Sequence, residues 1–149
     1  MMKNVKKRLK NERGLTLIEL LAVVVILGII AAIAIPSIGG LINNSKLDAH
    51  IANAQQMVNA ARVAATSNEL EFNTSNQATV TLETLISDGY IEQIEDPTGN
   101  GNYNQTNSLV RITRGDNGTY TYEVTLAPTT GTAYITNADV SDLTRDDFR

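Results

Sequence analysis

The sequence contains no cysteine and a single histidine, His50. Without cysteine, the chain has no thiol nucleophile, no thiolate ligands for zinc and no disulfide framework. One histidine provides neither a serine–histidine–aspartate arrangement of the usual kind nor a cluster of histidines that could bind a metal ion. No glycine-rich phosphate loop and no paired catalytic constellation compensates for these absences. We therefore expect a protein that is not an enzyme and needs no cofactor or metal.

Positive charge is scarce after the first fourteen residues. Residues 1–14 carry six Lys or Arg side chains and one acid, a net charge of +5, whereas the rest of the chain sums to −9. The net charge of −4 therefore combines two regions of opposite sign. An acidic body has no general electrostatic attraction for nucleic acid, so we expect no direct nucleic-acid binding.

The basic start is followed by a long apolar run, in which 18 of the 21 residues from Leu15 to Ile35 are hydrophobic. As a helix this run would be about 32 Å long, which matches a bilayer hydrocarbon core of about 30 Å. Positive charge before such a segment keeps that end in the cytoplasm. The pattern predicts a single membrane-spanning helix with a cytoplasmic N-terminus and the acidic body on the other side.

Two simpler interpretations of this run are a secretory signal peptide, cleaved after Ala32-Ile33-Ala34, and a plain uncleaved anchor. However, the run exceeds the 7–15 residues typical of a signal peptide's apolar region, and it contains Glu19. A charge at mid-membrane costs on the order of 2.5–3.5 kcal/mol, so Glu19 requires either a position near the lipid headgroups or a cationic partner. Cleavage between Gly14 and Leu15 would create an α-amino group four residues before Glu19.

The residues Gly14-Leu15-Thr16-Leu17-Ile18-Glu19, between a basic leader and an apolar helix, resemble the class III signal of type IV pilins and pseudopilins. The resemblance implies that a prepilin peptidase cleaves after Gly14 and N-methylates Leu15. The family usually has Phe at this first mature position, so Leu15 is a departure. Glu19 matches the family's glutamate, which neutralises the amine of an adjacent subunit during filament assembly.

Three further positions concern the packing and shape of the apolar helix. Gly28 and Ala32 form a small-xxx-small pair that allows another helix to approach closely. Pro36 lacks a backbone donor, so a kink is expected there. Gly28 and Pro36 also fall where the family tends to place residues that soften the helix.

Helical periodicity continues beyond the membrane segment. One apolar stripe at spacings of three and four residues predicts that the helix extends from about Leu15 to about Ala65, with the stripe facing the core of a head domain. We expect a leader at 1–14, a membrane or filament-core helix at 15–36, an amphipathic half at 37–66 and a head at 67–149. The stripe consists of Leu47, Ile51, Ala54, Val58, Ala61 and Ala65.

The head is predicted to be small and rich in loops. Its fold class is α+β and pilin-like: a small antiparallel sheet packed on the second half of the long helix. Only 26 of the 80 residues from 70 onward are apolar, so the helix must supply part of the core. The expected elements are a polar linker at Thr66–Thr81, a short helix at Leu82–Ile91 ended by Gly89, a loop at Asp96–Asn107, strands at Leu109–Arg114, Thr119–Leu126 and Ala133–Thr136, and an acidic tail or short turn at Asp139–Arg149.

Three features of the chain after the membrane segment could carry chemistry, and each favours a simpler interpretation. Asp96–Asn107 has oxygen ligands at spacings similar to a calcium loop, but its twelfth residue is Asn107 where an EF-hand needs a glutamate, so we expect a surface loop. The aspartates of Asp139–Arg149 are expected to be solvated. His50 lies among polar residues on the helix, which predicts a surface histidine.

The resemblance implies a structural subunit of a type IV pilus or pilus-like filament. Its partners would be further copies of the chain in a helical filament, a prepilin peptidase, and the assembly platform and ATPase machinery. The precursor would be a single-pass membrane protein, and the assembled form an extracellular pilus. A competence or type II secretion pseudopilin shares the motif, and a membrane-anchored surface-binding protein that never polymerises is the other alternative. By the same resemblance, the lack of cysteine favours a Gram-positive source.

Overall fold

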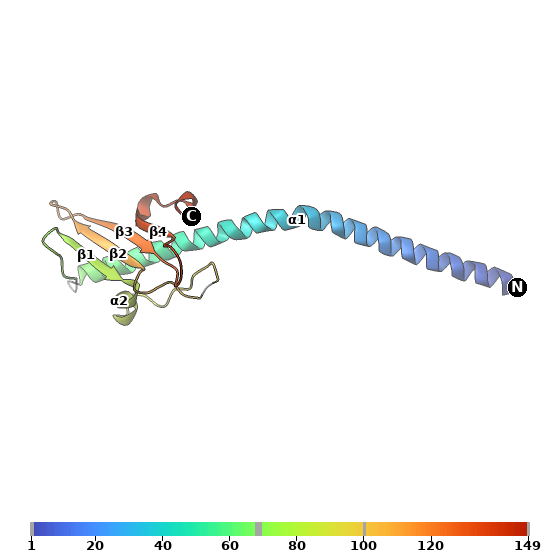
Figure 1. Ribbon diagram of the computed structural model, residues 1–149, viewed down its shortest axis with the longest axis horizontal. Helices are drawn as coiled ribbons and strands as arrows, with labels where there is room; N and C mark the ends of the chain where they lie inside the picture. Colours follow the sequence, from blue (N-terminus) through green and yellow to red (C-terminus); the bar gives the residue numbers. More distant parts are fainter. Residues whose placement is uncertain (1, 68–69, 100, 149) are drawn as a thin grey trace. The chain divides into compact units, whose positions relative to one another are not determined.

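The computed structural model describes residues 2–67, 70–99 and 101–148, with side chains from residue 16 onward. The chain divides into two compact units, Met1–Asn43 and Asn44–Arg149. Helix α1, Met2–Thr66, runs through both units and therefore begins within the basic leader. All the other elements belong to the second unit (Figure 1).

The first unit consists of the N-terminal part of α1. From Thr16 onward the helix is long and apolar enough to cross a membrane. The helix is continuous through Pro36 and through Gly39 and Gly40. A proline removes one backbone hydrogen bond without ending a helix that its surroundings favour. The kink expected at Pro36 stays a prediction.

The second unit is a four-stranded antiparallel sheet against the C-terminal part of α1 (Figure 1). The strands lie in the order β1-β2-β3-β4, so each strand pairs with its neighbour in sequence. The predicted α+β class, with a long helix packed on a small antiparallel sheet, is confirmed. The strand bounds are Gln77–Thr81 for β1, Leu109–Arg114 for β2, Tyr120–Leu126 for β3 and Ile135–Asp139 for β4.

The hairpin between β2 and β3 forms where the sequence predicted it. The residues between the strands close a turn in which the backbone N–H of Gly115 donates to the carbonyl of Thr119 at 2.7 Å. Gly118 has a φ of 75°, a left-handed conformation that a residue with a Cβ rarely adopts. Val110 pairs with Val124, and both side chains face the core.

The segment predicted to be a polar linker, Thr66–Thr81, contains a strand, and that expectation is wrong for its last five residues. Strand β1 pairs with β2 along its whole length. Ala78 and Val80 are buried while the Thr residue between them is exposed. Such alternation is the signature of a strand with one covered face, although its small, polar residues gave only a weak hydrophobic signal.

The short helix and the third predicted strand occur with shifted bounds. Helix α2 spans Leu82–Ser87, and Thr81 caps its N-terminus by accepting a hydrogen bond from the backbone N–H of Thr84. Gly89 follows with a φ of 78°, as a glycine after a helix C-terminus commonly does. The last strand, β4, begins two residues later than predicted and continues to Asp139.

The core of the head lies between α1 and the sheet. The predicted stripe faces this core: its last four members are buried, and Leu47 and Ile51 are half-buried against the same cluster. The helix thus supplies one wall of a core whose other wall comes from alternate strand residues. The strand residues in this core are Val80, Val110, Ile112, Val124, Leu126 and Ile135.

The acidic C-terminal segment forms two short 3₁₀ turns, Val140–Asp142 and Arg145–Asp147, as the short-turn alternative predicted. The Arg145 guanidinium donates two hydrogen bonds of 2.6 Å to the Asp48 carboxylate on α1. Phe148 is buried in the core cluster. The segment is therefore held against the helix by a bidentate ion pair and an aromatic anchor.

Candidate functional site

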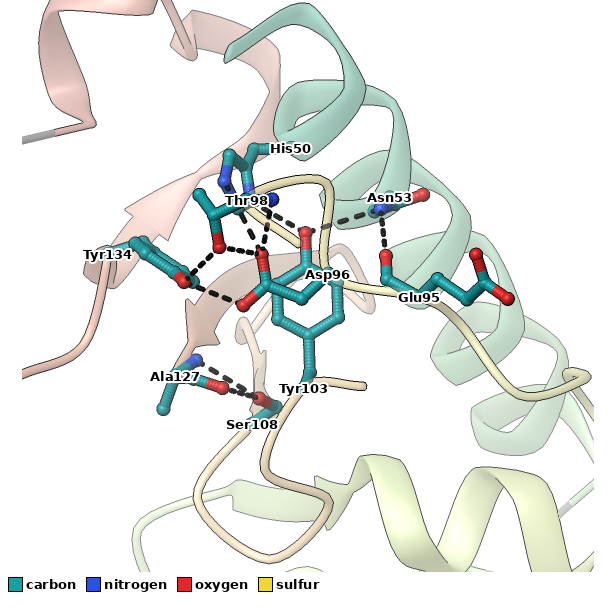
Figure 2. A network of polar contacts seen from close by, with 9 residues as sticks. All are labelled: His50, Asn53, Glu95, Asp96, Thr98, Tyr103, Ser108, Ala127 and Tyr134. Carbon is teal, nitrogen blue, oxygen red and sulfur yellow. Dashed lines mark hydrogen bonds and ion pairs between the residues drawn. The ribbon is translucent and has the colours of Figure 1, made fainter. Parts of the chain in front are cut away.

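A buried group of polar side chains joins α1 to the loops of the head (Figure 2). His50, Asp96 and Tyr103 are 1%, 4% and 1% exposed. The prediction of a surface histidine is therefore wrong. The prediction of a surface loop at Asp96–Asn107 is wrong for Asp96 and Tyr103, whereas Gly99, Gly101, Thr106 and Asn107 are exposed. The members come from three parts of the second unit. His50 and Asn53 lie on α1, Asp96, Thr98 and Tyr103 lie in the loop between α2 and β2, and Tyr134 is the residue before β4.

His50 is held by hydrogen bonds and by aromatic rings. Its Nδ1 lies 2.6 Å from the Tyr103 hydroxyl. The Asn53 side-chain amide donates to that hydroxyl and to the carbonyl of Glu95, both at 3.2 Å. The Phe148 ring stacks on the imidazole with a centroid distance of 5.4 Å. The histidine therefore has one fixed ring orientation between the helix, the loop and the C-terminal segment.

The Asp96 carboxylate lies at the centre of the same group (Figure 2). Its Oδ1 accepts hydrogen bonds from the backbone N–H of Thr98, at 2.9 Å, and from the Thr98 hydroxyl. Its Oδ2 accepts from the Tyr134 hydroxyl at 2.6 Å. The Nε2 of His50 lies 3.9 Å from Oδ1. These donors replace the hydrogen bonds to water that the carboxylate loses when it is buried.

The surroundings of the group lower the pKa values of His50 and Asp96 and raise the pKa of Tyr103. Burial lowers the pKa of His50, although the nearby Asp96 opposes this shift. Burial raises the pKa of Asp96, but hydrogen bonds from Thr98 and Tyr134, together with His50, outweigh it, so the net pKa is lowered. Burial also raises the pKa of the Tyr103 hydroxyl. At neutral pH the group therefore combines a neutral imidazole, a charged carboxylate and a protonated phenol.

This arrangement suits a structural network better than catalysis. The phenol of Tyr103 is harder to ionise than usual, and the imidazole and carboxylate are closed off from solvent. Within the described residues, every buried side-chain nitrogen and oxygen has a hydrogen-bond partner, and no group of three His, Cys, Asp or Glu residues could hold a metal ion. A fully satisfied polar network fixes one arrangement of the segments that supply it.

The N-terminal part of α1 has the opposite character, because its apolar side chains are exposed. Sixteen large hydrophobic side chains between Leu17 and Ile42 are 51–71% exposed. At roughly 2 kcal/mol per fully buried side chain, leaving them in water forgoes on the order of 20 kcal/mol. That exceeds the typical net stability of a domain, about 5–15 kcal/mol. This surface therefore requires lipid or other apolar helices around it.

The residues predicted for processing and assembly lie along this apolar helix. Gly14 and Leu15 lie outside the residues whose side chains the structure describes, although both belong to α1. Glu19 is exposed, about one helical turn or 6 Å along the axis from Leu15. Among the side chains described, no ion pair includes Glu19.

The predicted packing positions are open on the helix surface. A Cβ atom built on Gly28 meets no other side chain or distant backbone within 4 Å. Ala32 lies one turn further along the helix and is exposed. Together they leave a shallow strip where the backbone of a second helix can approach.

Comparison with known families identifies the segment that contains these residues. Residues 9–35 match the family described as the prokaryotic N-terminal methylation motif. The chain carries this methylation motif. No curated protein and no solved structure gave a significant match.

The methylation motif is the class III signal peptide of type IV pilins, so the resemblance predicted from the sequence is confirmed. It supports a type IV pilin-like prepilin or pseudopilin, for which a structural rather than an enzymatic role is expected. Together with the apolar helix, the motif fits a membrane-anchored precursor that a prepilin peptidase processes. The matched residues include Gly14, Leu15, Glu19, Gly28 and Ala32, and end just before Pro36.

Proposed function

We propose that this chain is the structural subunit of a type IV pilus or pilus-like filament. In this proposal a prepilin peptidase removes residues 1–14 and methylates the new N-terminus at Leu15. The mature subunit then leaves the bilayer and joins the filament through α1. The observation that carries the proposal is the exposed apolar helix directly within and after the methylation motif.

Removal of the leader changes the charge of the helix end. Cleavage removes a segment of net charge +5, which holds the precursor's N-terminus in the cytoplasm. The new α-amino group of Leu15 lies about one helical turn from Glu19. An amine of this subunit or of a neighbour can therefore neutralise the carboxylate, which reduces the cost of placing Glu19 in an apolar filament core.

Transfer from lipid to filament needs a driving force other than the hydrophobic effect, because lipid chains and apolar helices are similarly non-polar. Close packing at Gly28 and Ala32 supplies dispersion contacts between helices. The pairing of Glu19 with an amine adds an electrostatic contribution. Pro36 then marks the end of the filament-core part of the helix, before the half that carries the head.

The first test measures the N-terminus of the protein extracted from membranes. Intact-mass and N-terminal peptide analysis should give a chain that starts at Leu15 and carries one added methyl group. Gly14→Val, which introduces a branched side chain at the cleavage position, should leave the leader attached. A mature chain that begins at Met1 or after Ala34 contradicts the processing step.

The second test separates processing from assembly. Glu19→Ala should still be cleaved, but it should reduce the amount of subunit in sheared surface fibres by a large factor relative to the membrane pool. Glu12→Ala is the matched control, because Glu12 is the only acid in the leader and is lost on cleavage. If Glu19→Ala assembles as well as Glu12→Ala, the charge-pairing role is wrong. If the unaltered chain stays monomeric on crosslinking, the filament role is wrong.

A further inference from the structure

The exposed apolar surface of α1 continues past the run that composition assigns to the membrane. Ile38, Leu41 and Ile42 are 52%, 67% and 51% exposed, like the large apolar side chains earlier in the helix. Two asparagines follow, and the first compact unit ends at the first of them, Asn43. Among the described residues after Ile42, Val63 alone has a large aliphatic side chain that is exposed.

This apolar surface is too long for an upright helix in a bilayer. It extends over the 28 residues from Leu15 to Ile42, which form a helix of about 42 Å, whereas the hydrocarbon core is about 30 Å thick. Three arrangements are possible. The helix enters the hydrocarbon at Leu15 and leaves its last apolar residues in water, or it tilts until the whole surface fits, or it enters the hydrocarbon later and leaves it at Ile42.

The position of the one acid in this surface favours the third arrangement. An ionised carboxylate is costly in hydrocarbon, and the first two arrangements both place Glu19 there. The second also needs a tilt of about 45°, beyond the usual range of about 0–40°. Between Leu20 and Ile42 the chain has no charged residue. These residues form a helix of about 34 Å, which crosses the hydrocarbon with an ordinary tilt of about 20–30°.

We propose that the precursor crosses the bilayer with residues 20–42, so that Glu19 lies at the level of the cytoplasmic lipid headgroups. The side chains of Ile38, Leu41 and Ile42 then contact lipid chains near the opposite boundary. Gly14 lies about 8 Å along the helix from Glu19, on the cytoplasmic side. Glu19 enters apolar surroundings only when the subunit joins a filament, so its amine partner is needed at that step and not in the bilayer. This inference rests on the membrane-anchored precursor of the proposed function.

Cysteine accessibility measures the position of the helix directly, because the natural chain contains no cysteine. Single cysteines replace Thr16, Leu27, Ser37 or Ser45 in the full-length precursor, in a bacterial host that has no prepilin peptidase and no filament assembly machinery. Broken membranes expose both faces to a membrane-impermeant maleimide, and chain solubilised in detergent gives the reference rate. Maleimide reacts with the thiolate, which forms in water and not in hydrocarbon, so a buried cysteine should react at least about tenfold more slowly.

Thr16→Cys and Ser37→Cys distinguish the three arrangements. The proposal expects slow labelling at Ser37, about 8 Å inside the outer boundary, and fast labelling at Thr16, about 6 Å outside the cytoplasmic one. The reverse pattern indicates a span from Leu15 to Ile35 and overturns the proposal. Slow labelling at both positions indicates a steeply tilted helix, and fast labelling at both indicates a span shorter than proposed. Each of these results also overturns it.

The other two positions separate a wrong boundary from a wrong anchor. Ser45→Cys lies outside all three spans and should label rapidly, whereas Leu27→Cys lies inside all three and should label slowly. Rapid labelling of Leu27→Cys would show that α1 does not span the membrane, which overturns the anchored precursor as well as this inference. If Leu27→Cys labels slowly, a failure at Thr16 or Ser37 concerns only the boundaries of the span.

A second variant tests whether Glu19 sets these boundaries. Glu19→Leu removes the only charge between Leu15 and Ile42, so the start of the run can enter the hydrocarbon and labelling of Thr16→Cys should slow at least about fivefold. Glu12→Leu makes the same exchange in the leader and is the control, which should leave that labelling unchanged. Resistance to alkaline extraction establishes that each variant is inserted. Equal labelling of Thr16→Cys in the two backgrounds overturns the role of Glu19.

Discussion

Replacing Tyr103 with phenylalanine removes one oxygen atom from the centre of the buried network. That hydroxyl lies 2.6 Å from the Nδ1 of His50 and accepts a hydrogen bond from Asn53. Both Tyr103 and His50 are 1% exposed, so no water replaces the lost group. The substitution keeps the aromatic ring and its contacts, and therefore perturbs the hydrogen bonds alone.

The expected loss of stability follows from the groups left behind. In either tautomer, the Nδ1 of His50 becomes a buried polar atom without a partner, which costs about 1–3 kcal/mol. Asn53 is half-buried and keeps its bond to Glu95, so its contribution is smaller. We expect the free energy of unfolding of the head to fall by about 2 kcal/mol. For a domain near 100 residues this lowers the melting temperature by about 10 °C.

Thermal unfolding monitored by near-UV circular dichroism measures this effect selectively. All five tyrosines lie in the head and the chain has no tryptophan, so the signal does not depend on the apolar part of α1. Tyr120→Phe is the control, because within the described residues the Tyr120 hydroxyl makes no hydrogen bond. If Tyr103→Phe lowers the melting temperature no more than Tyr120→Phe, the network does not stabilise the head as argued.

Two further predictions concern acid and the C-terminal segment. Because folding lowers the pKa of His50, the unfolded chain takes up a proton before the folded chain does as the pH falls below 6.5. The urea midpoint of unfolding should therefore decrease at a pH above that at which the carboxylates titrate. A midpoint that stays constant or rises contradicts this prediction. Asp96, whose pKa is also lowered, should add a further loss as the pH falls below 3.8. Asp48→Asn removes the bidentate partner of Arg145 and should accelerate tryptic cleavage after Arg145. Asp116→Asn, in the turn between β2 and β3, is the control. Equal cleavage rates in the two variants would show that the ion pair does not hold the C-terminal segment.

The elements that the sequence predicted well are those whose pattern is local. The apolar run and the stripe on α1 repeat at helical spacing over many turns, and the β2–β3 hairpin has both an alternating pattern and a turn rich in glycine. Strand β1 has no comparable pattern, because Ala78 and Val80 are small and their neighbours are polar. Only pairing with β2, about thirty residues later in the chain, makes that segment a strand.

The buried network shows the same limitation at the level of single residues. The polar neighbours of His50 predict a surface position. However, His50 lies three residues after Leu47 and four before Ala54, so it belongs to a second row on the buried face of α1. That spacing was available in the sequence. The partners were not, because Asp96, Tyr103 and Tyr134 reach the helix from distant loops, and no local pattern specifies such contacts.

The network also explains how a head without cysteine closes its C-terminal segment. The residues after β4 contain few apolar side chains, so hydrophobic burial alone anchors them weakly. Phe148 stacks on His50, and Arg145 pairs with Asp48 half a helical turn earlier on α1. Both anchors meet the same short stretch of helix, and His50 is itself fixed by Tyr103. A substitution that disturbs the buried His50 therefore weakens the anchor of Phe148 as well as the core. The stability of the core is thus linked to the position of the C-terminal segment.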